Sequence, residues 1–552
     1  MQTVLSNNKE NSLKFQTLGQ ILVGKNIVKQ SDLEFCFAIQ QADKVKRKIG
    51  HYLVEHNFAC ERDIAQALSE ASGYKFFCGE YVPNMEVVKE ITVQFLEDKK
   101  IFPLLNDGKI IFILTEIYDT ETTDYLQSKF GLEIEFYVAE ESEIIRAIEA
   151  IIRETSKEDV GKLFSVVDDV TADKLAVEIL EYAVAASASD IHIEPAETVV
   201  EIRLRVDGVM QFYRILPIDM LNKLTNVFFH LSSIQASDFM QFHDNRFDFE
   251  FLGHHMDVRL SHLPGGRGSG LCLRLLDQNQ SAKSLQSLGY AEAHWNLLSK
   301  AMTSPNGIIL MTGPTGCGKS TSLYAIINSL KGINRKILSV EDPIEVRLSL
   351  VTQVPVDLKK GHTFAVIARA FLRHDPDIIL IGEIRDSETA QVAIQASGTG
   401  HLVFSTLHTN DPVSALLRLR DLSVDYSNIA NNVRCIVSQR LVRKLCVCKD
   451  RKRVNRSQLN EFTSNYLTHD EQDVFVPVGC RKCSGVGYLG RTVIGETLFI
   501  DDEIQKLVAQ GNVHGIGSVL KERGSYLTIK NDARRLVKES VLSLDEAVRI
   551  LG

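Results

Sequence analysis

Gly313-Pro314-Thr315-Gly316-Cys317-Gly318-Lys319-Ser320, followed by Thr321, is the stretch of sequence that decides the fold. It fits the pattern G-x-x-x-x-G-K-[ST], with an apolar run at 308–311 before it and a helix-compatible run at 322–330 after it. In such a strand–loop–helix unit the loop N–H groups surround phosphates, the lysine reaches the β- and γ-phosphates, and the serine ligates Mg²⁺. The sequence therefore predicts a nucleotide-phosphate site on residues 313–321, with Lys319 and Ser320 in these two roles.

Three further apolar runs end in polar residues. The run 378–381 ends at Gly382-Glu383, the run 337–340 is followed by three acids within 341–345, and the segment 400–409 has a histidine near each end. Short apolar runs alternating with helical stretches are typical of a parallel sheet buried on both faces, and ligands bind at the carboxyl ends of its strands. We therefore expect these polar groups to meet the phosphate loop in one site.

On either side of this core, the chain divides into regions that differ in their sequence patterns. Gly19 and Gly50 lie at equivalent positions of a repeat with a period of 31 residues, whose apolar spacing indicates two helix pairs. The strand pattern at 199–206 and the turn Asp207-Gly208 indicate an α+β domain before the core. The predicted regions are a helical repeat domain (1–75), the rest of an α+β N-terminal region (76–153, with a helix at 140–153), a linker (154–170), an α+β domain (171–285), an α/β core (286–440), a cysteine-bearing module (441–495) and a helical C-terminal region (496–552).

Composition and the length of the apolar runs argue against a general nucleic-acid-binding protein and against a membrane-spanning one. The chain has 552 residues, of which 44% are hydrophobic, and its formal net charge is −9. This length predicts three or four domains, and the acidic balance argues against general nucleic-acid binding. The apolar runs are too short to span a membrane, we expect no signal peptide, and the scattered cysteines favour a reducing compartment. We therefore expect a cytoplasmic protein.

The motifs together resemble those of the ATPases of type II secretion and type IV pilus assembly. The resemblance rests on the phosphate loop, the acidic run 341–345, Ala188–Pro195, Arg203–Gly208, Leu372–Asp386, Gly400–Asn410 and Gln439–Cys446. It implies a hexameric motor that hydrolyses ATP, with a PAS-like domain beside a RecA-like core. It also implies partners in an inner-membrane platform, at whose cytoplasmic face the motor would act.

The same resemblance assigns roles in hydrolysis. Glu345 is implied as the base that activates water, and Glu383 as the acid that holds the Mg²⁺ shell. His401 and His408 are implied as sensors of the γ-phosphate. Arg259 and Arg274 of the PAS-like domain are implied at the nucleotide, where a cation stabilises the negative charge of phosphoryl transfer.

Four cysteines form the only cysteine group in the sequence: Cys446, Cys448, Cys480 and Cys483. Two C-x-x-C pairs that bind structural zinc are usual in the family, but here the first pair is the shorter C-x-C. Four thiolates still favour a closed tetrahedral Zn²⁺ site without catalytic function. The basic residues between the two pairs are either a solvated loop or a contact for anionic lipid or an acidic partner; they are Lys449, Arg451, Lys452 and Arg453.

The N-terminal repeat resembles a module that binds cyclic di-GMP in some relatives, but its ligand-facing positions differ. Thr17 and Lys48 stand where arginine is expected, and threonine cannot bind phosphate bidentately. Asn26, Asn57 and Ala71 replace further expected residues. We expect the fold to be retained and the binding of cyclic di-GMP to be lost.

Two alternatives and one residue-level hypothesis remain open. The chain could be a pilus-retraction or DNA-handling RecA-type motor, although the cysteine module and long N-terminal region disfavour the first and the acidic charge the second. It could also be a non-catalytic nucleotide-binding scaffold, although all the catalytic acids are present. Finally, the backbone N–H groups and Lys319 around Cys317 predict a depressed thiol pKa and a reactive side chain.

Overall fold

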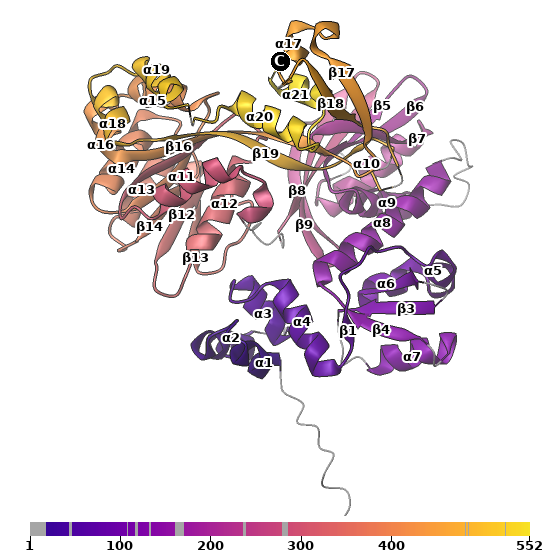
Figure 1. Cartoon of the computed structure of the whole chain (residues 1–552). Helices are drawn as coiled ribbons and strands as arrows, with labels where there is room; N and C mark the ends of the chain where they lie inside the picture. The colour runs from indigo at the N-terminus through magenta and orange to yellow at the C-terminus, as the bar shows by residue number, and fades with distance from the viewer. Residues whose placement is uncertain are drawn as a thin grey trace, which may run out of the picture. The chain divides into compact units, whose positions relative to one another are not determined.

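The computed structural model describes residues 18–43, 47–106, 109–115, 120–131, 134–160, 171–235, 239–278, 285–467, 469–480, 482–483, 485–524 and 526–551. It divides into two compact units (Figure 1). One contains residues 1–186 with the short pieces 222–227 and 250–253, and the other contains the remainder. No helix in the described ranges is both long enough and apolar enough to cross a membrane.

The chain begins, in its described part, with the predicted pairs of helices. Gly19 and Gly50 explain the repeat, because a Cβ on Gly19 would lie 2.8 Å from Leu33 and one on Gly50 would lie 3.0 Å from Ile64. These contacts are related by the same 31-residue shift, so each glycine lets a helix approach its neighbour closely. The helices are α1 (Leu18–Gly24), α2 (Gln30–Ala42), α3 (Ile49–Glu55) and α4 (Glu61–Ser72). Thr17 lies outside the described residues.

The rest of the first unit is built on a four-stranded sheet of order β1-β4-β3-β2. Helix α8 continues to Val160, past the predicted end at 153 and into the predicted linker, of which residues 161–170 lie outside the described part. The polar composition of 154–160 lacks the apolar periodicity from which a helix is predicted in a sequence. The elements are β1 (Lys75–Phe76), α5 (Met85–Ile91), α6 (Val93–Lys99), β2 (Ile101–Asn106), β3 (Lys109–Leu114), α7 (Thr120–Phe130), β4 (Glu135–Val138), α8 (Glu141–Val160) and α9 (Ala172–Ala185).

The predicted PAS-like domain contains a six-stranded antiparallel sheet of order β7-β6-β5-β10-β9-β8. Asp207 and Gly208 both have positive φ, as a tight hairpin turn between β6 and β7 requires. The elements are β5 (Ala188–Pro195), β6 (Val199–Val206), β7 (Val209–Pro217), α10 (Met220–Leu231), β8 (His243–Phe251), β9 (His254–Gly265) and β10 (Gly268–Asp277).

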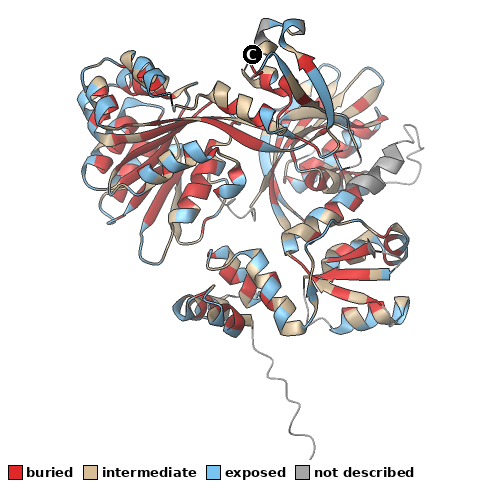
Figure 2. Ribbon diagram, in the orientation of Figure 1, coloured by how far each residue is buried: buried red, intermediate tan, exposed pale blue. Residues whose placement is uncertain are grey.

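The predicted α/β core is confirmed as a seven-stranded sheet of order β13-β12-β14-β15-β11-β16-β19. Its pairs are parallel except for β16 and β19. Strands β11, β12, β14 and β15 are buried throughout, which accounts for their uninterrupted apolar runs (Figure 2). The strands are β11 (Gly307–Thr312), β12 (Ile337–Glu341), β13 (Val351–Pro355), β14 (Ile378–Ile381), β15 (Leu402–Leu407), β16 (Val433–Leu445) and β19 (Tyr488–Phe499).

Helices accompany these strands in the order that a doubly wound fold requires. The helical elements of the core are η2 (Gln286–Leu288), α11 (Glu292–Met302), α12 (Lys319–Leu330), η3 (Leu358–Lys360), α13 (Phe364–Phe371), α14 (Ser387–Gly398), α15 (Pro412–Asp421) and α16 (Tyr426–Asn432).

The cysteine module is an insertion between β16 and β19. Both strands run past the predicted boundaries at 440 and 495, because the module's ends are strands of the core sheet. Helices follow β19, as predicted. The remaining elements are β17 (Asp450–Asn455), η4 (Arg456–Gln458), α17 (Glu461–Ser464), β18 (Glu471–Val476), α18 (Asp502–Ala509), α19 (Gly515–Arg523), α20 (Ile529–Lys538) and α21 (Leu544–Leu551).

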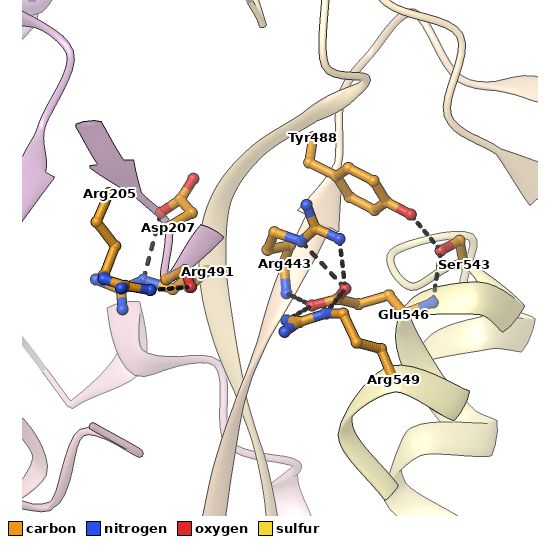
Figure 3. A network of polar contacts seen from close by, with 9 residues as sticks. Arg205, Asp207, Arg443, Tyr488, Arg491, Ser543, Glu546 and Arg549 are labelled. Atoms are coloured by element: carbon orange, nitrogen blue, oxygen red, sulfur yellow. Dashed lines mark hydrogen bonds and ion pairs between the residues drawn. The ribbon is translucent and has the colours of Figure 1, made fainter. Parts of the chain in front are cut away.

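A buried ionic cluster fixes the last helix to the core sheet (Figure 3). The Glu546 carboxylate on α21 is fully buried and accepts hydrogen bonds from Arg443 of β16 at 2.7 Å and from Arg549 at 2.6 Å. The ring of Tyr488 lies 4.0 Å from the Arg443 guanidinium, and its hydroxyl is 2.8 Å from Ser543. A buried carboxylate is stable only when paired in this way.

Candidate active site

The phosphate loop connects β11 to α12, as the sequence predicts. Gly313, Gly316 and Gly318 have φ values of 143°, 75° and 86°, a conformation that residues with a Cβ rarely adopt. At Gly313 space is also restricting, since a Cβ would lie 2.5 Å from the Cys317 Sγ and 2.6 Å from the Gln439 carbonyl oxygen. The glycines of the motif are therefore required by the path of the backbone.

Lys319 is the first residue of α12 and its side chain is folded back onto the loop. The Nζ donates to the carbonyls of Gly313 at 2.8 Å and Pro314 at 3.1 Å. Burial lowers the pKa of Lys319, and the negative charge of Glu383 partly opposes this effect. The ammonium thus lies against two carbonyls of the loop and near Glu383, which follows β14.

Glu383 and His408 meet at the carboxyl edge of the sheet, as predicted. Glu383 follows β14 and His408 follows β15, and the His408 Nε2 lies 2.9 Å from the Glu383 Oε1. The other carboxylate oxygen accepts a hydrogen bond from Arg385 Nε at 2.8 Å, and the same arginine lies 3.5 Å from Asp342. The ends of β12, β14 and β15 are therefore joined by one polar network.

The acidic run after β12 contains Glu341, whose side chain is buried, and Glu345, whose side chain is exposed. Glu341 is buried, and its carboxylate accepts hydrogen bonds from Ser339 at 2.6 Å and Gln353 at 3.0 Å, as well as from the Tyr324 hydroxyl. The oxygen of Tyr324 in turn accepts the Glu345 backbone N–H at 3.3 Å. Glu341 and Tyr324 thereby fix the backbone at Glu345.

Glu345 lies in an environment that shifts the pKa of its carboxyl. Partial desolvation raises the pKa of the Glu345 carboxyl above the usual value, while the nearby Ser320 hydroxyl and the charges of Arg259 and Arg274 oppose this shift. A carboxyl of raised pKa close to the serine of the phosphate-loop motif is suited to accepting a proton from water. Of the predicted residues, Ser320 and both arginines are therefore near enough to Glu345 to affect the pKa of its carboxyl.

The two arginines are neighbours on the antiparallel sheet. Arg274 on β10 pairs in register with Arg259 on β9 and, on its other side, with Asp190 on β5. The Asp190 carboxylate, which is buried, accepts the Arg274 Nε at 3.0 Å, and Asp257 lies 3.5 Å from the Arg259 Nε. These acids hold the two guanidinium groups side by side.

The prediction for His401 needs correction. His401 precedes β15 and lies at the amino edge of the sheet, where its Nδ1 is 2.8 Å from the Ala396 carbonyl. Six residues of strand separate it from His408, on the order of 20 Å at the rise of a parallel strand. Within one subunit only His408 reaches the phosphate edge, because the ends of a buried strand lie at opposite edges of the sheet.

The prediction of a reactive Cys317 is also wrong. Its side chain is 4% exposed, and burial raises its pKa despite the nearby charges of Lys319 and Arg440. The loop turns the thiol toward Gly313 and β16. Desolvation therefore outweighs the helix N-terminus and the lysine, which were the grounds of the prediction.

The four predicted cysteines come together despite the short C-x-C. Their sulfur atoms all lie within 4.8 Å of one another; the Sγ–Sγ distances are 3.7 Å for Cys446 with Cys480, and 3.8 Å for Cys483 with Cys448 and with Cys480. Tetrahedral zinc with Zn–S bonds of about 2.3 Å requires sulfur atoms about 3.8 Å apart. The donor set and its spacing therefore fit Zn²⁺.

The basic run in this module is largely paired within the protein. Arg451 and Arg453 on β17 form ion pairs with Asp473 and Glu471 on the neighbouring β18, and Lys449 donates to the Ser540 carbonyl at 2.6 Å. The alternative of a lipid-binding surface thus finds no support in this arrangement. The hairpin brings the acids opposite the bases, which the sequence spacing did not indicate.

Sequence reasoning assigned no role to Tyr290, Tyr324, Gln439 or Arg440, which all lie within this site. Gln439 donates to the Cys317 carbonyl at 2.7 Å, and Arg440 donates to the Asn410 side chain at 3.1 Å. The dipeptide Gln439-Arg440 belongs to a motif of the resemblance, which was the available signal. Tyr290 and Tyr324 offered no signal, because a single tyrosine on an apolar face normally indicates only a core residue.

Comparison with known families places this site in context. The model of the type II/IV secretion system protein family matches residues 166–549, and the MshEN domain model matches residues 78–158. The chain is 34% identical over 540 residues to the type IV pilus assembly ATPase PilB of Acinetobacter baylyi, a match that covers 93% of each chain.

A second relative and a solved structure agree with this result. The type II secretion system ATPase E of Vibrio cholerae is 38% identical over 385 residues, covering 69% of this chain and 76% of the relative. The structure of the Legionella pneumophila ATPase DotB matches with a TM-score of 0.52 at 22% identity, covering 69% of this chain and 96% of that one. The last likeness concerns the fold alone.

Proposed function

The chain belongs to the type II/IV secretion system protein family, and from that premise we propose that it drives the assembly of a type IV pilus or of a type II secretion pseudopilus. It is an ATPase that works as a hexameric motor. The observation that carries the residue-level proposal is that Glu345 lies close enough to Ser320 of the phosphate loop, and to two arginines of another domain, for them to lower the pKa of its carboxyl.

Glu345 takes the proton from the attacking water in the proposed mechanism. Arg259 and Arg274 stabilise the charge that spreads over the γ-phosphate oxygens, and the loop N–H groups with Lys319 bind the β- and γ-phosphates. Ser320 and Glu383 offer the hard oxygen ligands that Mg²⁺ prefers, Glu383 through the ion's water shell since its own oxygens are already bonded. Mg²⁺ bound there would neutralise phosphate charge.

The positions of the two arginines imply a motion of one domain relative to the other. They belong to the antiparallel sheet, whereas the base and the phosphate loop belong to the core. Hydrolysis therefore requires the two domains to be together, and release of phosphate removes the charge that the arginines meet. Alternation between these states would turn the chemical step into a domain motion.

Assembly of a type IV pilus is the finer proposal. The pilus ATPase of Acinetobacter baylyi matches along 93% of both chains, while the secretion ATPase of Vibrio cholerae matches along 69% of this one. We propose that the motor acts at the cytoplasmic face of the inner membrane on a platform protein. Deletion of the gene in its host tests this: loss of surface pili with normal enzyme secretion is expected, and the reverse pattern would assign it to secretion.

The remaining alternatives are disfavoured. A DNA-handling motor would require ATPase activity stimulated by DNA, which the acidic chain does not lead us to expect. A non-catalytic scaffold would lack a competent base, yet Glu345 is present and close to Ser320 of the phosphate loop.

A further inference from the structure

Gln439 lies directly against the phosphate loop, although the loop motif does not include it. It is on β16 with no exposed surface, and its Nε2 donates to the Cys317 carbonyl at 2.7 Å. A Cβ on Gly318 would lie 3.3 Å from this nitrogen, and one on Gly313 would lie 2.6 Å from the Gln439 carbonyl. Gln439 therefore contacts the loop at both of its ends.

This hydrogen bond determines the direction of a neighbouring N–H group. A trans peptide directs its C=O and its N–H to opposite sides. Because the carbonyl of Cys317 points at Gln439, the N–H of Gly318 is directed away from β16. Successive N–H groups of such a loop are the groups that bind phosphate. Fixing the carbonyl therefore fixes one donor of the phosphate cradle.

Tyr290 fixes the orientation of the Gln439 amide. Its hydroxyl lies 2.5 Å from the Gln439 Oε1 and 3.1 Å from the Ser322 Oγ. The hydroxyl has one proton, so it donates over the shorter distance and accepts from Ser322. The Oε1 is thereby the acceptor, and Nε2 is left to donate to Cys317. Burial raises the pKa of Tyr290, which keeps the hydroxyl protonated.

We propose that Gln439 and Tyr290 are positioning residues that hold the phosphate loop in its nucleotide-binding shape. This inference rests on the proposed nucleotide site at residues 313–321. The N–H group concerned would bind phosphate in ATP and ADP alike, so its loss weakens both ligands. The arginines differ, because they act on charge that develops during the reaction.

The test is the binding of fluorescent ADP and ATP analogues to the full chain, with steady-state kinetics. Gln439→Leu removes the hydrogen bond to the Cys317 carbonyl and the one from the Tyr290 hydroxyl, and it is expected to weaken the binding of both analogues about tenfold. Tyr290→Phe is expected to weaken their binding about threefold. KM for ATP should rise, while kcat at saturating ATP falls by less than about threefold. Adding Tyr290→Phe to Gln439→Leu should cause no further loss, because Tyr290 acts through Gln439.

Tyr526→Phe is the matched control, since it removes another mostly buried tyrosine hydroxyl of the core, bonded to Glu496 at 2.8 Å and absent from the loop. It should leave the nucleotide affinity unchanged. Unaltered affinity in Tyr290→Phe and Gln439→Leu, or an equal loss in Tyr526→Phe, would overturn the inference. Failure of the wild-type chain to bind nucleotide, or undiminished binding by Lys319→Ala, would instead refute the nucleotide site itself.

Discussion

Arg274 and Arg259 are the residues whose removal should separate catalysis from binding. The charge they meet develops in the transition state, so Arg274→Ala is expected to lower kcat about 100-fold or more with little change in ADP affinity. Arg259→Ala should act in the same direction. The rate of phosphate release at saturating ATP measures kcat, and titration with ADP measures the ADP affinity.

Arg267→Ala supplies the control for these arginine variants. Arg267 lies in the same sheet region, but its side chain is 71% exposed and is 3.9 Å from Glu197, which is 83% exposed. Its removal should leave kcat unchanged. A loss of ADP affinity in Arg274→Ala as large as the loss of kcat would show that the arginine binds the ground state instead.

Cys317 illustrates how burial changes a residue's chemistry. With its thiol buried and its pKa raised, maleimide should label the native chain at exposed cysteines such as Cys60 and Cys78, leaving Cys317 unmodified and the ATPase active. Peptide mass spectrometry after a short reaction gives the labelled positions. Rapid modification of Cys317, with loss of activity that Cys317→Ser prevents, would restore the sequence-based prediction.

At the scale of single elements, the two loops that carry the cysteines should form one zinc site. We expect about one Zn²⁺ per chain, loss of the metal in Cys448→Ser, and a lowered melting temperature after its removal. Metal analysis of the purified protein tests this, with Cys60→Ser, which changes an exposed cysteine, as the control. Full zinc content in Cys448→Ser, or none in the wild type, would contradict the assignment.

The stability of helix α21 should depend on pH because of the Glu546 carboxyl. Burial alone raises the pKa of this carboxyl, but hydrogen bonds from Arg549 and Arg443 outweigh it and hold the pKa below the usual value of 4.5. The stabilisation is therefore complete above about pH 4.5 and is lost as the pH falls through the lower, folded-state pKa. The hydrogen-exchange protection factor of α21, taken relative to the intrinsic exchange rate at each pH, should fall over that acidic range.

The corresponding variant tests the same cluster at neutral pH. Glu546→Gln leaves two arginines without their buried counter-charge and is expected to destabilise α21 by about 3 kcal/mol. Glu539→Gln breaks an exposed pair with Arg535 and should cost less than about 1 kcal/mol. Equal protection of α21 in both variants would show that the buried cluster contributes no more than a surface pair.

For the whole molecule, short sequence patterns predicted the features that depend on neighbouring residues alone. The glycine loop, the parallel core, the hairpin at Asp207-Gly208 and the four-cysteine cluster all follow from spacing, turn chemistry or metal-ligand chemistry. The edge at which His401 lies, the burial of Cys317 and the pairing of Arg451 with Asp473 depend on tertiary packing. Likewise, the contact of Gln439 with Cys317 joins residues 122 positions apart, which no local pattern can indicate.

The central claim is that ATP is hydrolysed at this loop with Glu345 as the base, and phosphate release by Glu345→Gln tests it most directly. The variant keeps the phosphate cradle, so it should bind ATP like the wild type while releasing phosphate about 100-fold or more slowly. As the pH is lowered, the wild-type rate should begin to fall above pH 4.5, because partial desolvation raises the pKa of Glu345 above that usual value. Near-normal turnover by Glu345→Gln, with ATP bound, would contradict the account.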